Sequence, residues 1–167
     1  ERPGKKCYVF GTRSFYSQLR DAGIPVTARP DPDVDILLCG FDRELTFQKL
    51  EDACILLNRG AEFWATNPDW VCPTWYGSVP DCGSVCRMLT TATGRTPRFL
   101  GKPQPDMVHL AMTRTGFTPE QTVLLGDRLY TDIACGKNAG VDTVFVLSGE
   151  GTEADIETFG VQPTWVR

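Results

Sequence analysis

Short apolar runs alternate with helix-like segments along the whole chain, and this alternation constrains the fold more than any other feature of the sequence. Residues 34–41 (VDILLCGF) form a continuous apolar run, as expected for a parallel strand that is covered on both faces. Residues 46–60 follow with apolar side chains at helical spacing, Thr46 as the N-cap and Gly60 at the C-terminal end. The strand–helix–strand pattern returns in the second half of the chain, where residues 122–127 and 143–149 are expected to be two more buried strands. We therefore expect an α/β fold with mostly parallel sheets and right-handed crossovers.

The pattern restarts near Arg98, and this restart predicts two units, residues 1–97 and residues 98–167. In the first unit we expect further strands at residues 6–10 and 62–67, and helices at residues 13–23 and 80–94. In the second unit we expect a helix at residues 105–116, whose inner face is formed by Met107, Leu110 and Ala111, and another at residues 130–138.

Composition excludes several classes of protein. With 41% apolar and 23% charged residues, the sequence is that of a globular protein, and no apolar run has the roughly 18 residues of a membrane span. A net charge of −4 argues against a nucleic-acid partner, which needs a basic surface. The seven cysteines contain no C-x-x-C pair, and His109 is the single histidine, so we expect reduced thiols, a cytoplasmic location and no structural zinc site.

Three charged residues follow expected strands of the second unit. Lys102 and Asp127 each come at the end of a strand, and Asp132 lies five residues after Asp127. Taken singly, they fit simpler roles: a surface lysine, a helix N-cap and an acidic residue in a first helical turn. Ligands bind at the carboxyl ends of parallel strands, so neighbouring strand ends would bring the three together. An ammonium group and carboxylates around Mg²⁺ are what a phosphate dianion needs.

At this point the sequence resembles a known family. The stretches LGKPQPDMVHLAM and TVLLGDRLYTDIACGKNAGVDTVFVLSG are similar to the third and fourth motifs of the haloacid dehalogenase-like (HAD) hydrolases. The first part of the chain resembles the large α/β cap of their para-nitrophenyl phosphatase (NagD-like) type. The resemblance implies that residues 1–97 are a cap whose first element is missing and that residues 98–167 are the C-terminal half of a Rossmann-like core.

The resemblance also implies a mechanism, a Mg²⁺-dependent phosphatase that works through an aspartyl-phosphate. Lys102 would steady the phosphate, Asp127 would bind Mg²⁺, and Asp132 would support the site either through water or by orienting Lys102. The attacking aspartate belongs to a D-x-D-G-T motif, which this sequence does not contain. GFDREL at residues 40–45 and ATNPDW at residues 65–70 both match the cap instead. We therefore expect the nucleophile upstream of Glu1, in a longer protein.

The cap would select the substrate. Residues 66–77 (TNPDWVCPTWYG) form an expected loop stiffened by prolines, in which Asn67 and Asp69 either contact the substrate or only make a turn. Arg128 is expected to reach solvent or a cap carboxylate. The aromatic side chains of this loop would stack on a substrate ring, fill the core of the cap or form a homodimer contact; they are Trp70, Trp75 and Tyr76.

Two functions stay open. The first is a hydrolase of small phosphorylated metabolites such as nucleotides, sugar phosphates or pyridoxal phosphate. The second is a catalytically inactive α/β module that binds a ligand or partner through the cap surface. A dinucleotide-binding domain fits less well, because no G-x-G-x-x-G follows the first strand. His109 lies opposite Leu110 and Ala111 on its expected helix and is assigned no role.

Overall fold

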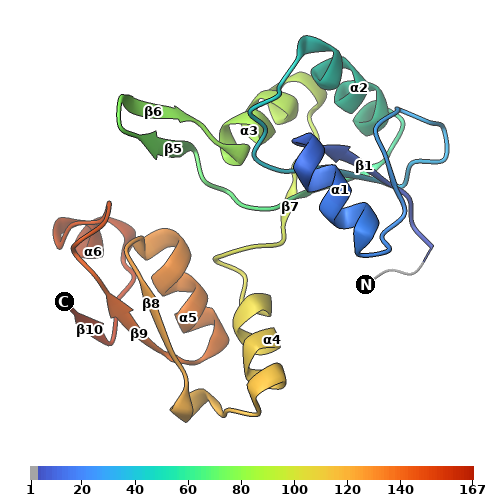
Figure 1. Cartoon of the computed structure of the whole chain (residues 1–167). Helices are drawn as coiled ribbons and strands as arrows, with labels where there is room; N and C mark the ends of the chain where they lie inside the picture. The colour runs from blue at the N-terminus through green and yellow to red at the C-terminus, as the bar shows by residue number, and fades with distance from the viewer. Residues whose placement is uncertain (1–3) are drawn as a thin grey trace. The chain divides into compact units, whose positions relative to one another are not determined.

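The computed structural model describes residues 4–167 and divides them into two compact units, which separate between Leu100 and Gly101 (Figure 1). Both units contain a parallel sheet with helices, so the expected α/β class is confirmed. The division falls three residues after the expected boundary, because the strand at Arg98–Phe99 pairs with the sheet of the first unit. No helix in residues 4–167 is both long and apolar enough to cross a membrane.

The first unit is built on a five-stranded parallel sheet in the order β2-β1-β3-β4-β7. Its registers include Cys7 with Ile36 and Leu37 with Phe63. The sheet strands are β1 (Cys7–Phe10), β2 (Val26–Thr27), β3 (Ile36–Cys39), β4 (Glu62–Ala65) and β7 (Arg98–Phe99), and the helices are α1 (Arg13–Asp21), α2 (Phe47–Asn58) and α3 (Cys82–Thr93).

Alternating side chains of these strands enter two separate cores, as the period of a strand requires. Phe10, Leu37 and Phe63 pack with buried residues of α2 and α3, whereas Ile36 and Leu38 pack with side chains of α1. Helices therefore cover both faces, which explains why β1 and β3 are apolar throughout. The predicted N-cap is confirmed as well, since Thr46 accepts a hydrogen bond from the backbone N–H of Lys49 (3.3 Å).

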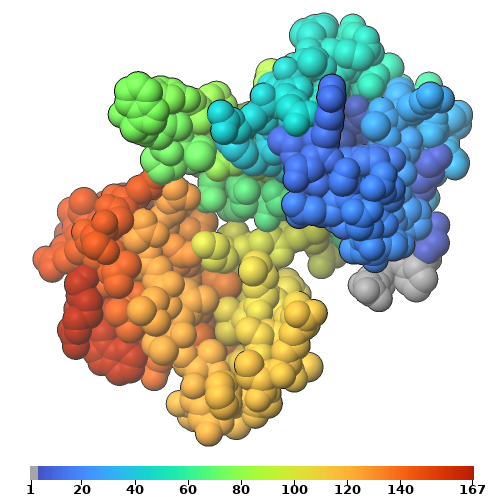
Figure 2. Space-filling view, viewed as in Figure 1, coloured from blue at the N-terminus to red at the C-terminus, as the bar shows by residue number. Residues whose placement is uncertain are grey.

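The expected loop after β4 is instead an antiparallel hairpin, β5 (Val71–Thr74) and β6 (Gly77–Pro80), which projects from the first unit in green in Figures 1 and 2. Gly77, with φ of 125°, provides the backbone conformation that reverses the chain after Tyr76. Trp75 at the turn is 94% exposed and meets Tyr76 edge to face, and Trp70 is also largely exposed. These aromatic side chains therefore do not fill the core of the first unit.

The second unit holds a three-stranded parallel sheet in the order β10-β9-β8. The expected helix at residues 130–138 is a π-helical turn followed by a shorter α-helix. The elements of this unit are α4 (Asp106–Thr115), the 3₁₀ turn η1 (Pro119–Gln121), β8 (Val123–Gly126), the π turn η2 (Leu129–Ile133), α5 (Ala134–Ala139), β9 (Asp142–Phe145), α6 (Ala154–Phe159) and β10 (Trp165–Val166).

Two expectations about burial in this unit are wrong. Helix α4 packs through Val108 and Met112, while Met107 (61% exposed), Leu110 and Ala111 face outward. Strand β8 is at the edge of its sheet and buries only one face, so Val123 and Leu125 are exposed. Both departures leave apolar side chains uncovered by the part of the chain that the structure describes.

Candidate active site

Asp127 lies directly after β8, so its side chain is held at the carboxyl end of the sheet of the second unit. Oδ2 of Asp127 accepts a hydrogen bond from the backbone N–H of Glu150 (3.0 Å), and its carbonyl accepts one from the N–H of Gly151 (3.0 Å). The loop after β9 therefore fixes the carboxylate from one side. Among the described contacts, Oδ1 of Asp127 accepts no hydrogen bond.

Glycine at position 149 is required by this arrangement. A Cβ atom built there would lie 2.0 Å from Oδ2 of Asp127, far inside contact distance. The sequence-based reasoning missed this loop, although the Gly-Glu-Gly of residues 149–151 directly after a strand was a visible signal.

Asp132 is buried, and each of its two carboxylate oxygens has a hydrogen-bond partner. Its Oδ1 pairs with Nζ of Lys102, and its Oδ2 accepts from the backbone N–H of Arg128 (3.2 Å). The side chain of Asp132 is 9% exposed and that of Lys102 is 46% exposed. Lys102 and the backbone of Arg128 are therefore the partners of the two carboxylate oxygens of Asp132.

Close packing around Gly126 holds Asp132 in place. A Cβ at Gly126 would lie 2.1 Å from the Cβ of Asp132, so only glycine at the end of β8 lets the aspartate approach. The π-helical turn η2 carries Asp132 back over this strand end, and the N–H of Asp132 donates to the carbonyl of Arg128 (2.9 Å).

The structure brings Lys102 to Asp132, but not by the expected route. The expectation was that adjacent strand ends of one sheet would deliver both residues, whereas β7 pairs with β4 in the first unit and not with β8. The segment after Lys102 is attached to α5 instead. Asn138 donates to the carbonyl of Pro103 (2.9 Å), Cys135 donates to that of Gln104 (3.1 Å), and the Lys102–Pro103 peptide bond is cis.

The donor set at the end of β8 suits Mg²⁺. That ion prefers hard carboxylate oxygens and keeps several waters, and Asp127 offers an uncommitted oxygen beside a half-open surface. Asp127 has one oxygen without a hydrogen bond among the described contacts, whereas both oxygens of Asp132 accept one.

The remaining predicted site residues are positioned by their neighbours. Asn67 Oδ1 accepts from the backbone N–H of Asp69 (3.0 Å), which is the turn considered for the Asn-Pro-Asp stretch. Arg128 donates through Nε to Glu150 (2.7 Å), a partner in its own unit. His109 is exposed on α4. Asn67 and Asp69 belong to the first unit, and Arg128 belongs to the second.

Known proteins resemble this chain over its whole length. A sequence model described as HAD-hydrolase-like matches residues 99–167. The ribonucleotide monophosphatase NagD of Escherichia coli is 35% identical over 163 residues, which are 98% of this chain and 63% of that protein.

Solved structures of phosphatases are similar to this chain in fold. The 4-nitrophenylphosphatase of Thermotoga maritima superposes with a TM-score of 0.89 and 37% identity, covering 99% of this chain and 63% of that one. The glycerol phosphate phosphatase of Mycobacterium tuberculosis, solved in complex with magnesium, has a TM-score of 0.92 and 30% identity, covering 100% and 51%. The chain spans 63% of the length of the first curated relatives it matches.

Proposed function

Because this chain belongs to the haloacid dehalogenase-like hydrolases, in a NagD-like subfamily, we propose that the complete protein is a Mg²⁺-dependent phosphatase of small phosphorylated metabolites. The observation that carries the proposal is the Lys102–Asp132 pair beside the end of β8, where Asp127 keeps an oxygen for a cation. Relatives named acid sugar phosphatase, ribonucleotide monophosphatase and 4-nitrophenylphosphatase support the substrate class.

Each residue has a distinct part in this proposal. Asp127 would hold Mg²⁺ through its uncommitted oxygen, with the loop at Gly149 and Glu150 fixing its rotamer. A bound Mg²⁺ would supply charge neutralisation for the phosphate oxygens. The Lys102 ammonium would bind a phosphate oxygen, and Asp132 would keep that ammonium directed at the site. Asn67, Asp69 and Arg128 are proposed to contact the substrate, and the hairpin at Trp75 to present an aromatic surface to it or to a second copy.

The nucleophile is proposed to be an aspartate from outside these 167 residues, which would form the phospho-enzyme by attack on phosphorus. The chain has no D-x-D-G-T motif. Strand β8 has an open edge and exposed Val123 and Leu125, an apolar surface that parallel sheets normally cover. Further strands beside β8 would cover these residues and bring the attacking carboxylate to the strand ends, next to Asp127.

The first test is hydrolysis of para-nitrophenyl phosphate by the complete protein. We expect turnover with Mg²⁺, its loss in EDTA and its return on adding Mg²⁺. Asp127→Asn should lower kcat/KM by about 10²–10³-fold, the equivalent of several kcal/mol of charge stabilisation. The matched control is Asp142→Asn at the other end of the same sheet, whose amide oxygen can still accept from Thr164, so its activity should be unchanged.

Undiminished turnover in EDTA, or in Asp127→Asn, would contradict the metal role. A complete protein that hydrolyses none of a panel of nucleotide, sugar and glycerol phosphates but still binds one of them would favour the alternative, an inactive binding module. The 167-residue chain alone is expected to show no turnover.

A further inference from the structure

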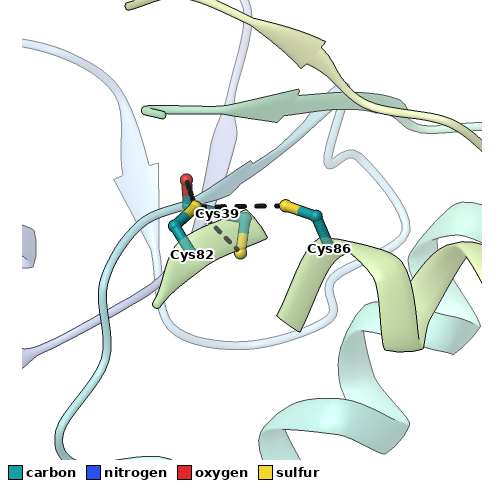
Figure 3. A group of neighbouring side chains, drawn as sticks. All are labelled: Cys39, Cys82 and Cys86. Carbon is teal, nitrogen blue, oxygen red and sulfur yellow. Dashed lines mark hydrogen bonds between the residues drawn. The ribbon is translucent and has the colours of Figure 1, made fainter. Parts of the chain in front are cut away.

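Three cysteines from distant parts of the sequence meet in the core of the first unit. Cys39 is the last residue of β3, and Cys82 and Cys86 lie one turn apart at the start of α3. All three are buried, and their sulfur atoms lie within 4.8 Å of one another. Figure 3 shows the three side chains converging, with the sulfur of Cys82 linked to the other two.

The spacing of the sulfur atoms fits a shared metal ion. The Sγ atom of Cys82 lies 3.9 Å from that of Cys39 and 3.9 Å from that of Cys86. Three thiolates around one ion, with metal–sulfur bonds of about 2.3 Å, would place their sulfurs about 4 Å apart. Two of the three sulfur–sulfur distances therefore match such a site, and the third is no longer than 4.8 Å.

The start of α3 offers positive electrostatic surroundings to the sulfur of Cys82. The site lies at the N-terminus of α3, a twelve-residue helix, where the helix dipole is positive. The hydroxyl of Thr66 donates to Cys82 Sγ (3.8 Å). A thiolate buried in an apolar core is costly unless a cation accompanies it.

We propose that Cys39, Cys82 and Cys86 bind one soft, thiophilic metal ion of the Cu(I) class in a three-coordinate, all-sulfur site. Sulfur ligands select soft ions and discriminate against Mg²⁺. Structural Zn²⁺ sites are closed by four protein ligands, and within residues 4–167 no histidine or carboxylate joins the three sulfurs. Each thiol that binds releases its proton to solvent, and neither sulfur nor metal changes oxidation state.

The consequence for the fold is a link between β3 and α3, elements that are 43 residues apart at Cys39 and Cys82. An ion that binds only the folded cap would stabilise it by mass action. The site is separate from the proposed Mg²⁺ site, which belongs to the second unit and offers oxygen ligands. The two predictions can therefore fail independently.

The test is an anaerobic Cu(I) titration of the reduced complete protein against a chromophoric Cu(I) chelator. We expect one tightly bound Cu(I), ultraviolet thiolate-to-metal absorption, and three sulfur neighbours by X-ray absorption spectroscopy. Cys82→Ala and Cys86→Ala should each weaken binding about 100-fold and lower the sulfur neighbours from three to two, since each variant removes one thiolate ligand. Cys7→Ala is the matched control, because Cys7 is also buried in this unit but packs in the other core.

Absence of stoichiometric Cu(I) binding would overturn the proposal, and so would full affinity in both alanine variants or loss of binding in Cys7→Ala. A preference for Zn²⁺, or a fourth ligand from nitrogen or oxygen, would overturn the three-sulfur assignment. Formation of a Cys82–Cys86 disulfide in preference to the metal complex under reducing conditions would do the same. X-ray absorption on the unaltered protein needs no variant, so it decides the question even if a variant does not fold.

Discussion

At the scale of single residues, the Lys102–Asp132 pair is the contact on which the proposed site depends. Asp132 is buried, and removing Lys102 would leave one of its oxygens without a partner among the described contacts. Leaving a buried acceptor unsatisfied costs about 1–3 kcal/mol. Because Lys102 is nearly half exposed, solvent screens its charge. We therefore expect Lys102→Ala to lower the free energy of unfolding by about 1 kcal/mol, the lower end of that range.

A double-mutant cycle measures the coupling energy between Lys102 and Asp132. In an Asp132→Asn background, Lys102→Ala should cost less than in the native protein, with a coupling energy of about 0.5–1 kcal/mol. Urea unfolding followed by fluorescence of Trp165, the single tryptophan after residue 100, would report on the second unit. Lys137→Ala, an exposed lysine on α5, is the control and should change little. Equal costs in both backgrounds would show that the two side chains are not coupled.

The sequence predicted that Lys102 and Asp132 would lie together, but not which neighbours hold them in place. Lys102, Asp127 and Asp132 could be selected because their spacing follows a motif with a physical purpose. The cluster of Cys39, Cys82 and Cys86 could not be predicted from the sequence. Only Cys82 and Cys86 are close in sequence, with C-x₃-C spacing, and Cys39 joins them only in the folded unit. Cysteine spacing alone indicates no metal site here, because it cannot show that Cys39 on β3 lies beside two cysteines of α3.

At the scale of elements, the start of α3 is packed tightly against the loop before the hairpin. A Cβ at Gly83 would lie 2.2 Å from the carbonyl oxygen of Pro68 and 2.7 Å from that of Asp69, and both are backbone atoms that cannot rotate away. Alanine is preferred over glycine in helices by about 1 kcal/mol, but overpacking costs about 1–3 kcal/mol. We therefore expect Gly83→Ala to destabilise the first unit by roughly 1–2 kcal/mol in thermal or urea unfolding.

The matched control for Gly83 is Thr91→Ala on the exposed face of the same helix, which should stay within about 0.5 kcal/mol of the native protein. A Gly83→Ala protein as stable as the native one, or more stable, would mean that helix propensity outweighs the contact with Pro68.

The type of an element, helix or strand, was predictable where the local pattern was strong. Which face of the element is buried was not predictable. The apolar run at residues 34–41 contains β3, and the Thr46 signal marks the start of α2. In α4, several apolar residues lie close together in sequence, and which of them points inward is decided by contact with α5 rather than by spacing. The hairpin was missed because Pro73 and Pro80 weaken a strand prediction, yet an isolated two-stranded hairpin is all edge and tolerates proline.

At the scale of the whole molecule, the chain consists of two units that each have their own apolar core. In the second unit, Phe145 is fully buried and packs with Leu129 and Ile133. In the first unit, Leu37 of β3 is fully buried and packs with side chains of α2 and α3. Separate cores allow separate local unfolding, because opening one unit does not expose the apolar side chains of the other.

Hydrogen exchange followed by mass spectrometry tests this separation in the complete protein. Phe145→Ala removes about 3–5 kcal/mol of packing and Leu37→Ala about 2–5 kcal/mol. We expect Phe145→Ala to speed exchange in peptides of β8 and β9 and to leave β1 and β3 protected, with the reverse for Leu37→Ala. If either variant sped exchange equally in both units, the two cores would be one cooperative structure. The proposed three-sulfur site of the first unit and the proposed Mg²⁺ site of the second would then also be energetically coupled.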